Sequence, residues 1–466
     1  MSLRLAIFLA DFDGQRACLA AKGSAGLKPC LLCANCVAAY SPAAEAGAFL
    51  RISECDIGRF SPLQEGELHQ LMDRTLPRLA QYTQQQRKLR ETLLGFNFQL
   101  CSLWNCRVAR SQLSLGKVCN DSMHCYFANG IAGLEMLLFL QQVKRKLGVG
   151  VERIADAACS AGWQRPARKR SQHGETAYWH KRLWRPTLFI GDFYKGSASQ
   201  TVALMSLLRW FTLQLGWSDV AAIAPYARCF LALCRCAQLV LRIDVTRSFD
   251  ALEAAQQEHQ RLFVELYPHS VRPKHHHRLH LPSHYRKFGV VVNCWPTEAK
   301  HKDYKGVVAR HTQHFLQEEN GGRSHSMRLL PKLLLRGCVL LREANVQRPP
   351  SFELDGELAA ETVRQQFGRS DCRAALGVAW GLLRLKADDV LWWGETRRDA
   401  GVLRLCVVAD GALHLCMQQL SLQQEDQSMR VFRLQAPTFF QPCAQLHMLG
   451  HPEWTSRKDD RVVCLL

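Results

Sequence analysis

The sequence predicts a helix-rich α+β fold with a small β-rich module at the C-terminal end. Residues 3–10 form an apolar run typical of a buried strand. Much of the segment 41–270 carries apolar residues at helical spacing, and from about residue 375 short alternating runs separated by Asp/Gly turns take over. At 47% hydrophobic and 22% charged residues, the chain can bury a core and is not disordered as a whole.

Each helical segment has its own pattern. Residues 61–95 are polar and Gln-rich, and they predict helix. Residues 120–146 predict one long helix, because apolar residues recur at helical spacing and Lys144-Arg-Lys146 suits a C-terminal dipole. The Ala- and Leu-rich segment 197–268 predicts two or three buried helices, and 290–317 predicts a short strand followed by a helix that Pro296 opens.

Charge is concentrated in the middle of the chain. The formal net charge is +19, and residues 141–350 hold 33 basic and 15 acidic residues together with thirteen of the eighteen histidines. Such a segment, with Trp163, Trp179 and Trp184 interleaved, predicts a polyanionic partner, for which DNA is the natural candidate. The candidate DNA-binding residues are Arg165, Arg168, Lys169, Arg170, Lys181, Arg182, Lys274, Arg286 and Lys287.

Membrane insertion is not expected. The most apolar stretch, Cys229–Ile243, contains Arg235 and Arg242, and the run at 3–10 is too short for a signal peptide. Twenty cysteines without a secretion signal favour a reducing, intracellular compartment, in which cysteines are core thiols or metal ligands. The sequence gives no prediction of oligomeric state.

Cys30, Cys33 and Cys36 follow a CxxCxxC spacing. One CxxC pair supplies half of a zinc site, so zinc is a candidate ligand. The second half is not evident, and we expect the fold to supply it from His69, His124 or Cys55. The alternative interpretation is a set of buried thiols.

A histidine-rich run follows the helical segment. Basic residues accompany these histidines, so the run favours a solvated basic face, while metal binding or contact with phosphates stays open. Its members are His275, His276, His277, His280 and His284.

Three acidic residues stand at the ends of predicted elements, where a functional role competes with a structural one. Asp11 ends the first strand, where a rigid sheet can fix a carboxylate for Mg²⁺, although an Asp that starts a turn is the simpler interpretation. Asp121 and His124 share one face of a helix start, where Asp121 is also a natural N-cap. Glu298 lies in the first turn of a helix, which the dipole alone explains.

Together these pieces resemble the DDE transposases of the CACTA, Plavaka and Zisupton-like group. Asp11 with the Gly-rich loop from Lys22 to Cys33 looks like the second catalytic Asp block. Asp121-Ser-Met-His124 is similar to the Asp-x-x-His signature, and 279–298, which ends in Trp295-Pro-Thr-Glu298, resembles the block around the catalytic Glu. The resemblance covers roughly residues 3–320.

The resemblance implies an RNase H-like core with a large helical insertion and a site that binds Mg²⁺ or Mn²⁺ for cleavage and transfer of DNA strands. Asp11 and Glu298 would be two of its carboxylates, and Asp121 and His124 would orient that site or the DNA. The first catalytic Asp would belong upstream of Met1, so we expect a truncated, catalytically impaired relic of a transposable element, located in the nucleus. The alternatives are a non-enzymatic DNA-binding protein and a zinc-dependent interaction module.

The predicted division of the chain follows from these assignments. The order is a partial core with the CxxCxxC loop, the helical insertion, the catalytic-Glu segment, a linker and the β-rich module. The corresponding ranges are 1–40, 41–270, 271–320, 321–374 and 375–466.

Overall fold

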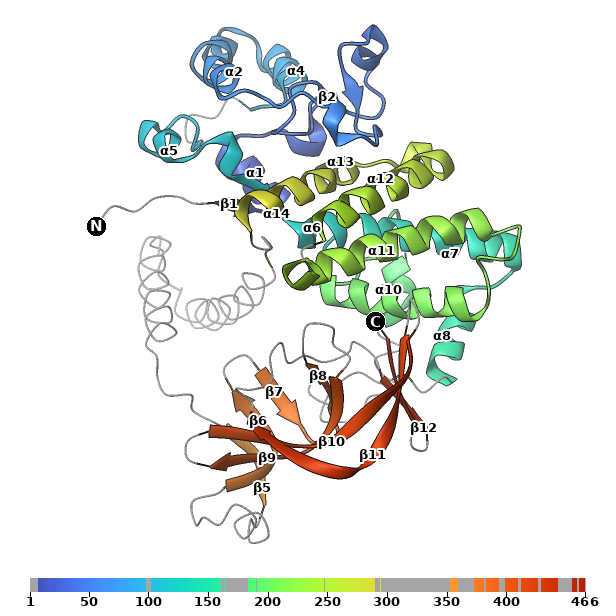
Figure 1. The fold of residues 1–466 in the computed structure, drawn as a ribbon. Coiled ribbons are helices and arrows are strands. Elements are labelled where there is room, and N and C mark those ends of the chain that lie inside the picture. The colour runs from blue at the N-terminus through green and yellow to red at the C-terminus, as the bar shows by residue number, and fades with distance from the viewer. Residues whose placement is uncertain are drawn as a thin grey trace, which may run out of the picture.

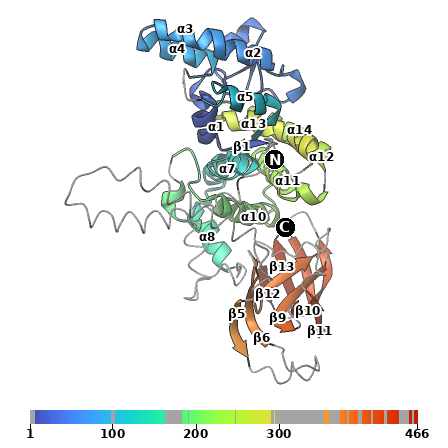
Figure 2. The same cartoon turned by 90° about the vertical axis from the view of Figure 1, so that its left-hand side faces the viewer.

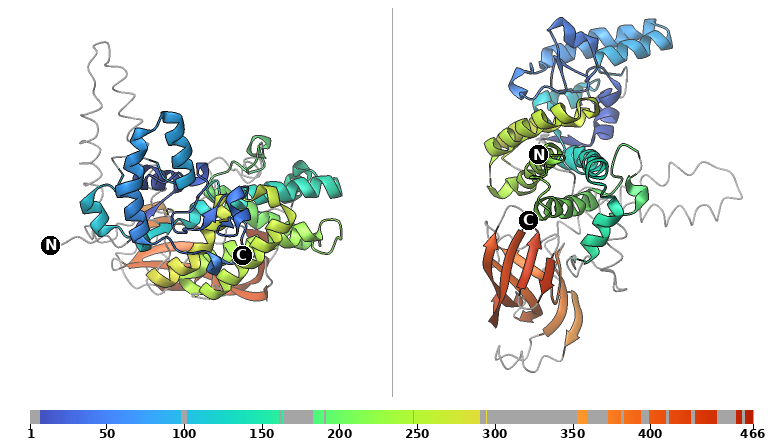
Figure 3. Two further views of the ribbon diagram at one scale, coloured as in Figure 1. Left: turned by 90° about the horizontal axis from the view of Figure 1, so that it is seen from above. Right: turned by 90° about the vertical axis from the view of Figure 1, so that its right-hand side faces the viewer.

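The fold mixes helices and sheet, as the sequence predicts. A computed structural model describes residues 7–97, 102–160, 163, 183–189, 191–246, 248–289, 294, 353–358, 373–380, 383–393, 399–409, 412–425, 429–442, 455–458 and 461–465. Figures 1 and 2 show three tiers: an N-terminal lobe, a helical body and a C-terminal sheet. The right-hand view of Figure 3 shows the same order of tiers, with the yellow-green helices α12–α14 between the lobe and the rest of the helical body.

The first strand has a partner from much later in the chain. β1 (Phe8–Ala10) pairs in parallel with β4 (Val118–Asn120), in a register that places Ala10 opposite Asn120. Between them lie α1 (Phe12–Leu19) and a second parallel pair, β2 (Cys36–Val37) with β3 (Leu50–Arg51). Of an RNase H-like sheet, the residues listed above contain only the β1–β4 pair, so that part of the fold remains a prediction.

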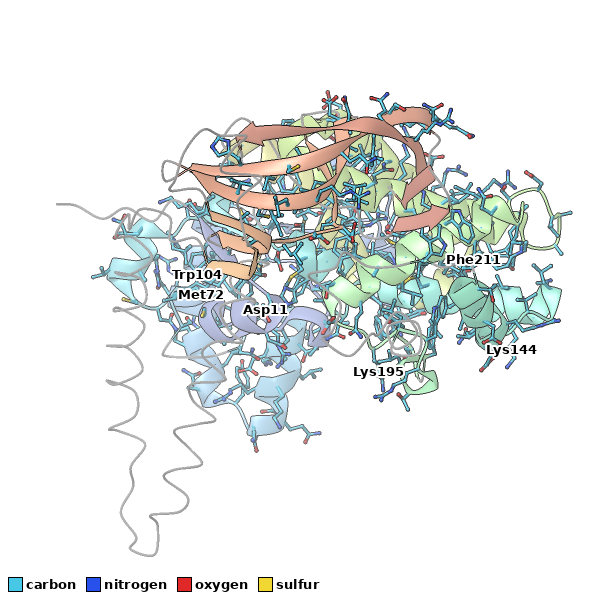
Figure 4. All side chains as sticks on the ribbon, turned by 90° about the horizontal axis from the view of Figure 1, so that it is seen from below. Asp11, Met72, Trp104, Lys144, Lys195 and Phe211 are labelled. Carbon is cyan, nitrogen blue, oxygen red and sulfur yellow. The ribbon has the colours of Figure 1, made fainter. Side chains whose placement is uncertain are left out.

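The polar segment 61–95 is helical. It forms α2 (Glu65–Gln70), a π-helical turn at Leu71–Thr75, α3 (Leu76–Arg78) and α4 (Gln84–Leu94). Thr83 caps α4 through a capping box with Gln86, and the helices bury Leu68, Met72 and Leu76 against Trp104. Figure 4 labels Met72 and Trp104 in this lobe, and Asp11 at the start of α1.

The single long helix expected at 120–146 is wrong. The chain forms α6 (Ser122–Tyr126) and α7 (Ile131–Leu147), with a break between them in which Asn129 adopts φ 49°. Gly130 is required there, since a Cβ on it would lie 2.4 Å from the Tyr126 carbonyl oxygen. The predicted end is confirmed, because Gly148 (φ 67°) stops α7 directly after its basic last turn.

The helical body confirms three buried helices in the segment 197–268. α10 (Ala198–Gln214), α11 (Ala224–Thr246) and α12 (Phe249–Leu266) pack with α7, and α8 (Val151–Ser160) lies beside them. Figure 4 shows Phe211 within this body and Lys144 and Lys195 at its rim. The helical stretch 122–147 is long and apolar enough to cross a membrane, but 78% of its most apolar window is buried inside the protein, as in a core helix.

Three short elements follow α12 and return the chain to the N-terminal lobe. They are α13 (Pro273–His277), a 3₁₀ turn at Arg278–His280 and α14 (Leu281–Phe288). α13 contacts α6, and α14 contacts β4. The helical insertion therefore ends where it began, beside the β1–β4 pair (Figure 1).

The C-terminal β module is a nine-stranded antiparallel sheet, with strand order β12-β13-β11-β10-β9-β6-β5 and with β7 and β8 paired to β6 and β9. It also takes in a strand upstream of residue 375, namely β5. The strands are β5 (Glu353–Leu358), β6 (Arg373–Trp380), β7 (Leu383–Lys386), β8 (Val390–Trp393), β9 (Asp399–Ala409), β10 (Ala412–Glu425), β11 (Met429–Pro442), β12 (Thr455–Lys458) and β13 (Arg461–Leu465).

Candidate metal centre and carboxylate edge

Cys30 and Cys33 supply two sulfur ligands from the loop after α1. Both side chains are buried, at 6% and 4% exposure, and the backbone N–H of Leu32 donates to Cys30 Sγ at 3.4 Å. The two sulfur atoms lie within 4.8 Å of each other. The predicted CxxC half-site is thus confirmed in its geometry.

The second half comes from the histidine-rich run. His276 and His280 are four residues apart across α13 and the following 3₁₀ turn, so both rings lie on one face. Their Nε2 atoms are 3.2 Å apart. His276 Nε2 lies 3.4 Å from Cys33 Sγ, and His280 Nε2 lies 3.4 Å from Cys30 Sγ and 3.5 Å from Cys33 Sγ.

These separations fit tetrahedral zinc. Zinc bonds of about 2.3 Å to sulfur and about 2.05 Å to nitrogen put adjacent S and N atoms about 3.5 Å apart and two N atoms about 3.3 Å apart. The four ligand atoms all lie within 4.8 Å of one another and all four residues are buried. Cys30, Cys33, His276 and His280 therefore form a Cys2His2 cluster able to hold a metal ion such as zinc, with no open position for water.

The surroundings of Cys30 favour its thiolate, which is the form that binds a metal. Burial raises the pKa of the Cys30 thiol, but the hydrogen bond from Cys33 and the nearby His280 and His276 outweigh it, so its pKa lies well below the ordinary value. The pKa of Cys33 is raised, because it gives its proton to that hydrogen bond with Cys30 and is itself buried. A cation between the two sulfurs would favour both thiolates.

Several ligand expectations are wrong. Cys36 is buried nearby but lies outside the four-residue cluster, and His69, His124 and Cys55 do not complete it. The solvated basic face predicted for the histidine run is also wrong, since every one of these histidines is at most 9% exposed. The H-x-x-x-H spacing of His276 and His280 was the signal in the sequence that could have identified the missing half.

The carboxylate edge lies next to the metal cluster. Asp11 and Asp121 each follow directly on one strand of the parallel β1–β4 pair, so the two residues stand side by side at its carboxyl end. Gln15 ties the two strand ends together by donating to Ala10 O at 3.3 Å and to Cys119 O at 3.1 Å. Asn120 donates to His277 O at 3.0 Å, which joins this edge to the helix that carries His276.

The Asp121 carboxylate is saturated with hydrogen bonds. Oδ1 accepts from the Met123 N–H at 3.2 Å and from the Cys294 N–H at 2.8 Å, while Oδ2 accepts from the His124 N–H at 3.1 Å and contacts His124 Nδ1. Burial raises its pKa, but the His124 and Cys294 hydrogen bonds prevail and hold the pKa below the ordinary value. Asp121 therefore orients His124 and anchors the backbone at Cys294, four residues before Glu298.

The Asp11 carboxylate accepts fewer hydrogen bonds than that of Asp121. Its Oδ1 accepts from the Gly14 N–H at 2.6 Å and so caps α1, and no described residue donates a hydrogen bond to Oδ2. Glu298 lies outside the described residues, as do Arg165, Arg168, Lys169, Arg170, Lys181 and Arg182. No carboxylate cluster suited to Mg²⁺ or Mn²⁺ occurs among the residues that the structure describes.

The three described candidates for DNA binding already have partners within the protein. Lys274 donates to Ala128 O at 3.2 Å and to Asn129 O at 2.8 Å. Lys287 donates to Gly116 O at 2.6 Å, and Arg286 pairs with two carboxylates on α12. These side chains hold α13 and α14 in place, whatever else they contact.

Arg278, His259 and Glu135 form a buried hydrogen-bonded chain that the sequence did not reveal. Arg278 donates to His259 Nδ1 at 2.7 Å, and His259 Nε2 lies 2.6 Å from Glu135 Oε2. All three side chains are fully buried. Although Cys229 also approaches, a second metal site is disfavoured, because Nδ1 accepts from Arg278 and Nε2 must then carry the proton that it donates to Glu135.

No family model, no curated protein and no solved structure matches this chain. The likeness to DDE transposases consequently rests on its motifs. Two of these motifs, the Asp11–Cys33 block and the Asp121–His124 pair, lie together in space, while the third ends in residues outside the description.

Proposed function

We propose that this chain is a DNA-processing protein of the DDE transposase type, stabilised by a structural zinc ion. The observation that carries the proposal is the placement of Asp11 and Asp121 at the end of two paired parallel strands, with Asp121 bound to the backbone at Cys294. The bond places Cys294, which precedes Glu298 by four residues in the sequence, at the same edge as the strand that ends in Asp11. Segments separated by the whole helical insertion thereby meet at one edge, as a shared catalytic site requires.

The Cys2His2 cluster supports the same arrangement. It links the loop after α1 to the helix pair that precedes Cys294, so bound zinc would hold both parts of the proposed site in register. Because its four ligands fill a tetrahedral shell and exclude water, this centre is structural. Hydrolysis is assigned to the carboxylate edge.

At that edge, the proposed roles differ between residues. Asp11, with one carboxylate oxygen uncommitted, and Glu298 would hold Mg²⁺ or Mn²⁺, which when bound would supply charge stabilisation at a DNA phosphodiester. Asp121 and His124 are positioning residues, since the Asp121 oxygens are already occupied. The basic segment 141–350 supplies attraction to phosphates, and a DNA partner implies a nuclear location.

The test begins with DNA binding by the zinc-loaded full chain. Anisotropy of a fluorescent duplex should give an affinity that falls steeply as salt rises, because counterions are released. Iron(II) substituted for Mg²⁺ should then cleave the polypeptide near residue 11 when peroxide is added, and Asp11→Asn should abolish the cleavage. Asp13→Asn is the matched control, since Asp13 is exposed on the same helix start and should leave the cleavage intact.

Each failure points to a different alternative. Salt-sensitive DNA binding without cleavage near residue 11 would indicate a non-enzymatic DNA-binding protein. The hydrogen bonds that already use both Asp121 oxygens and Asp11 Oδ1 favour that candidate. Absent or salt-insensitive DNA binding would leave a zinc-dependent interaction module.

A further inference from the structure

A cavity of about 420 Å³ opens directly beside the carboxylate edge. It lies where the start of α1, the break before α7, the segment around Phe193 and the start of α13 meet. Its volume falls within the range of about 300–1,000 Å³ that is usual for small-molecule sites. Neither the metal cluster nor the proposed roles of Asp11 and Asp121 use this cavity.

The cavity combines an apolar wall with cationic groups. Phe12, Ile131, Leu134 and Phe193 form the apolar part. Arg16, Arg272 and Lys274 also line it, and they come from both of the elements that flank the metal cluster. An aromatic ring system linked to a phosphate has the matching chemistry: its ring fits the apolar wall and its anion fits the cations.

The carboxylates within the cavity are held only weakly. Asp13 pairs with Arg16 at 3.3 Å and Asp192 pairs with Arg272 at 3.4 Å, and the two acidic side chains are 88% and 74% exposed. Such exposed ion pairs are weak, so a phosphate can displace either carboxylate from its arginine. Lys274 gives two of its three protons to main-chain carbonyls and keeps one donor.

The cavity adjoins the proposed site of chemistry. Phe12 follows Asp11 in the chain, and Lys274 interacts electrostatically with both Asp11 and Asp121. We propose that this cavity holds one unstacked nucleotide of the DNA strand whose phosphodiester lies at the carboxylate edge. That the nucleotide belongs to a DNA strand rests on the proposed function. That the ligand is a nucleotide rests on the lining of the cavity itself.

The experiment uses 2-aminopurine, whose fluorescence is quenched in a stacked duplex and rises when the base leaves the stack. The zinc-loaded full chain is titrated into a duplex carrying this base, and anisotropy of an end label measures binding separately. Fluorescence should rise on binding. Ser24→Trp, at the exposed mouth of the cavity, should remove the rise, while Ala25→Trp on the neighbouring exposed residue outside the lining should keep it.

A second arm uses free 2-aminopurine deoxynucleoside monophosphate. Arg16→Gln should weaken its binding about tenfold, as expected for loss of one charge-assisted contact. Asp13→Asn should strengthen it, because the competing carboxylate is removed. The opposite signs separate ligand binding from a general loss of folding.

The outcomes are distinguishable. DNA binding without a fluorescence rise, or with an equal rise in Ser24→Trp, overturns the cavity proposal and leaves the proposed function standing. The chain could instead bind the free nucleotide, with the expected effects of Arg16→Gln and Asp13→Asn, but not bind DNA. That result would overturn the proposed function and the assignment of the ligand to DNA, and the cavity would remain a nucleotide site. Binding of neither overturns both.

Discussion

His276 Nε2 lies 3.4 Å from Cys33 Sγ, although 243 residues separate the two in the chain. Two sulfurs from the N-terminal lobe and two imidazoles from the end of the helical insertion thus converge on one point. A metal at that point would close a very long loop, so much of its binding free energy would become folding free energy.

The purified chain should contain one zinc ion at the Cys2His2 cluster. Cys33→Ser and His276→Ala should each lose the metal and lower the melting temperature, and a chelator should do the same to the wild type. Metal analysis and Co²⁺ substitution, which gives absorption bands diagnostic of tetrahedral thiolate ligation, are the measurements. Cys36→Ala is the matched control in the same CxxCxxC run, and loss of metal in that variant would contradict the assigned ligand set.

Stability should depend on pH through the buried Glu135. Burial raises the pKa of Glu135 to about 8 from an ordinary value of 4.5, so the folded state keeps a proton that the unfolded state has lost. The stability that Glu135 contributes is therefore fully present below pH 4.5. It is lost as pH rises through about 8. Its partner His259 has a pKa held well below 6.5 by burial and by Arg278, so its effect is confined to acid.

Urea unfolding of the zinc-loaded chain between pH 6.5 and 8 tests this. The wild type should lose about 1.6 kcal/mol over that interval, because the slope of about 1.4 kcal/mol per pH unit falls to half that value at the pKa. Glu135→Gln, which cannot titrate, should show a flatter profile. Identical slopes for the two proteins would show that Glu135 is ionised in the folded state throughout.

Asp121→Ala should release the chain at Cys294. The substitution removes both the acceptor for the Cys294 N–H and the partner of His124 in a buried site, at a cost of about 3–5 kcal/mol. Cys294, which is 8% exposed, should then react with iodoacetamide much faster, as read by mass spectrometry. Cys119, buried on β4, serves as the internal control, and equal acceleration at both thiols would indicate global unfolding instead.

Gly130→Ala should destabilise the junction between α6 and α7. A Cβ at Gly130 would lie 2.2 Å from the Tyr126 carbonyl carbon and 2.6 Å from the Phe127 nitrogen, and backbone atoms cannot move away cheaply. We expect a loss of about 2–4 kcal/mol in thermal or urea unfolding. Gly66→Ala in α2 has open space around the added methyl and should be neutral or stabilising, so similar losses in both variants would refute the argument.

The sequence predicted those parts of the fold that depend on local pattern. The helices of 197–268, the end of α7 after its basic turn and the strands β8 to β11 all follow from periodicity and caps. The break at Asn129–Gly130 was missed, because apolar spacing continues across it, and the lack of room for a Cβ beside Tyr126 is visible only in the fold. The partner of β1 was also hidden, since β4 has only three residues.

The candidate site also combines residues that could be identified from the sequence with residues that could not. Cys30 and Cys33 were identifiable from their spacing, whereas His276 and His280 were obscured by the basic residues around them. The basic residues beside these histidines predict a charged and solvated run. In the fold, Arg278 turns inward to His259 and the histidines are buried, so the run forms part of the interior and not a solvated face. Glu135 had no sequence signal at all, since a lone acid in an apolar helix gives no indication of its partner.

The distance along the chain between the two halves of the metal cluster also sets an order of events during synthesis. Cys30 and Cys33 leave the ribosome about 250 residues before His280. At about 5–20 residues per second, the thiols spend roughly 12–50 s without the imidazoles that complete their shell. β1 waits in the same way for β4, across more than one hundred residues. The N-terminal lobe is therefore made first, but it can be completed only after the whole helical insertion has been synthesised.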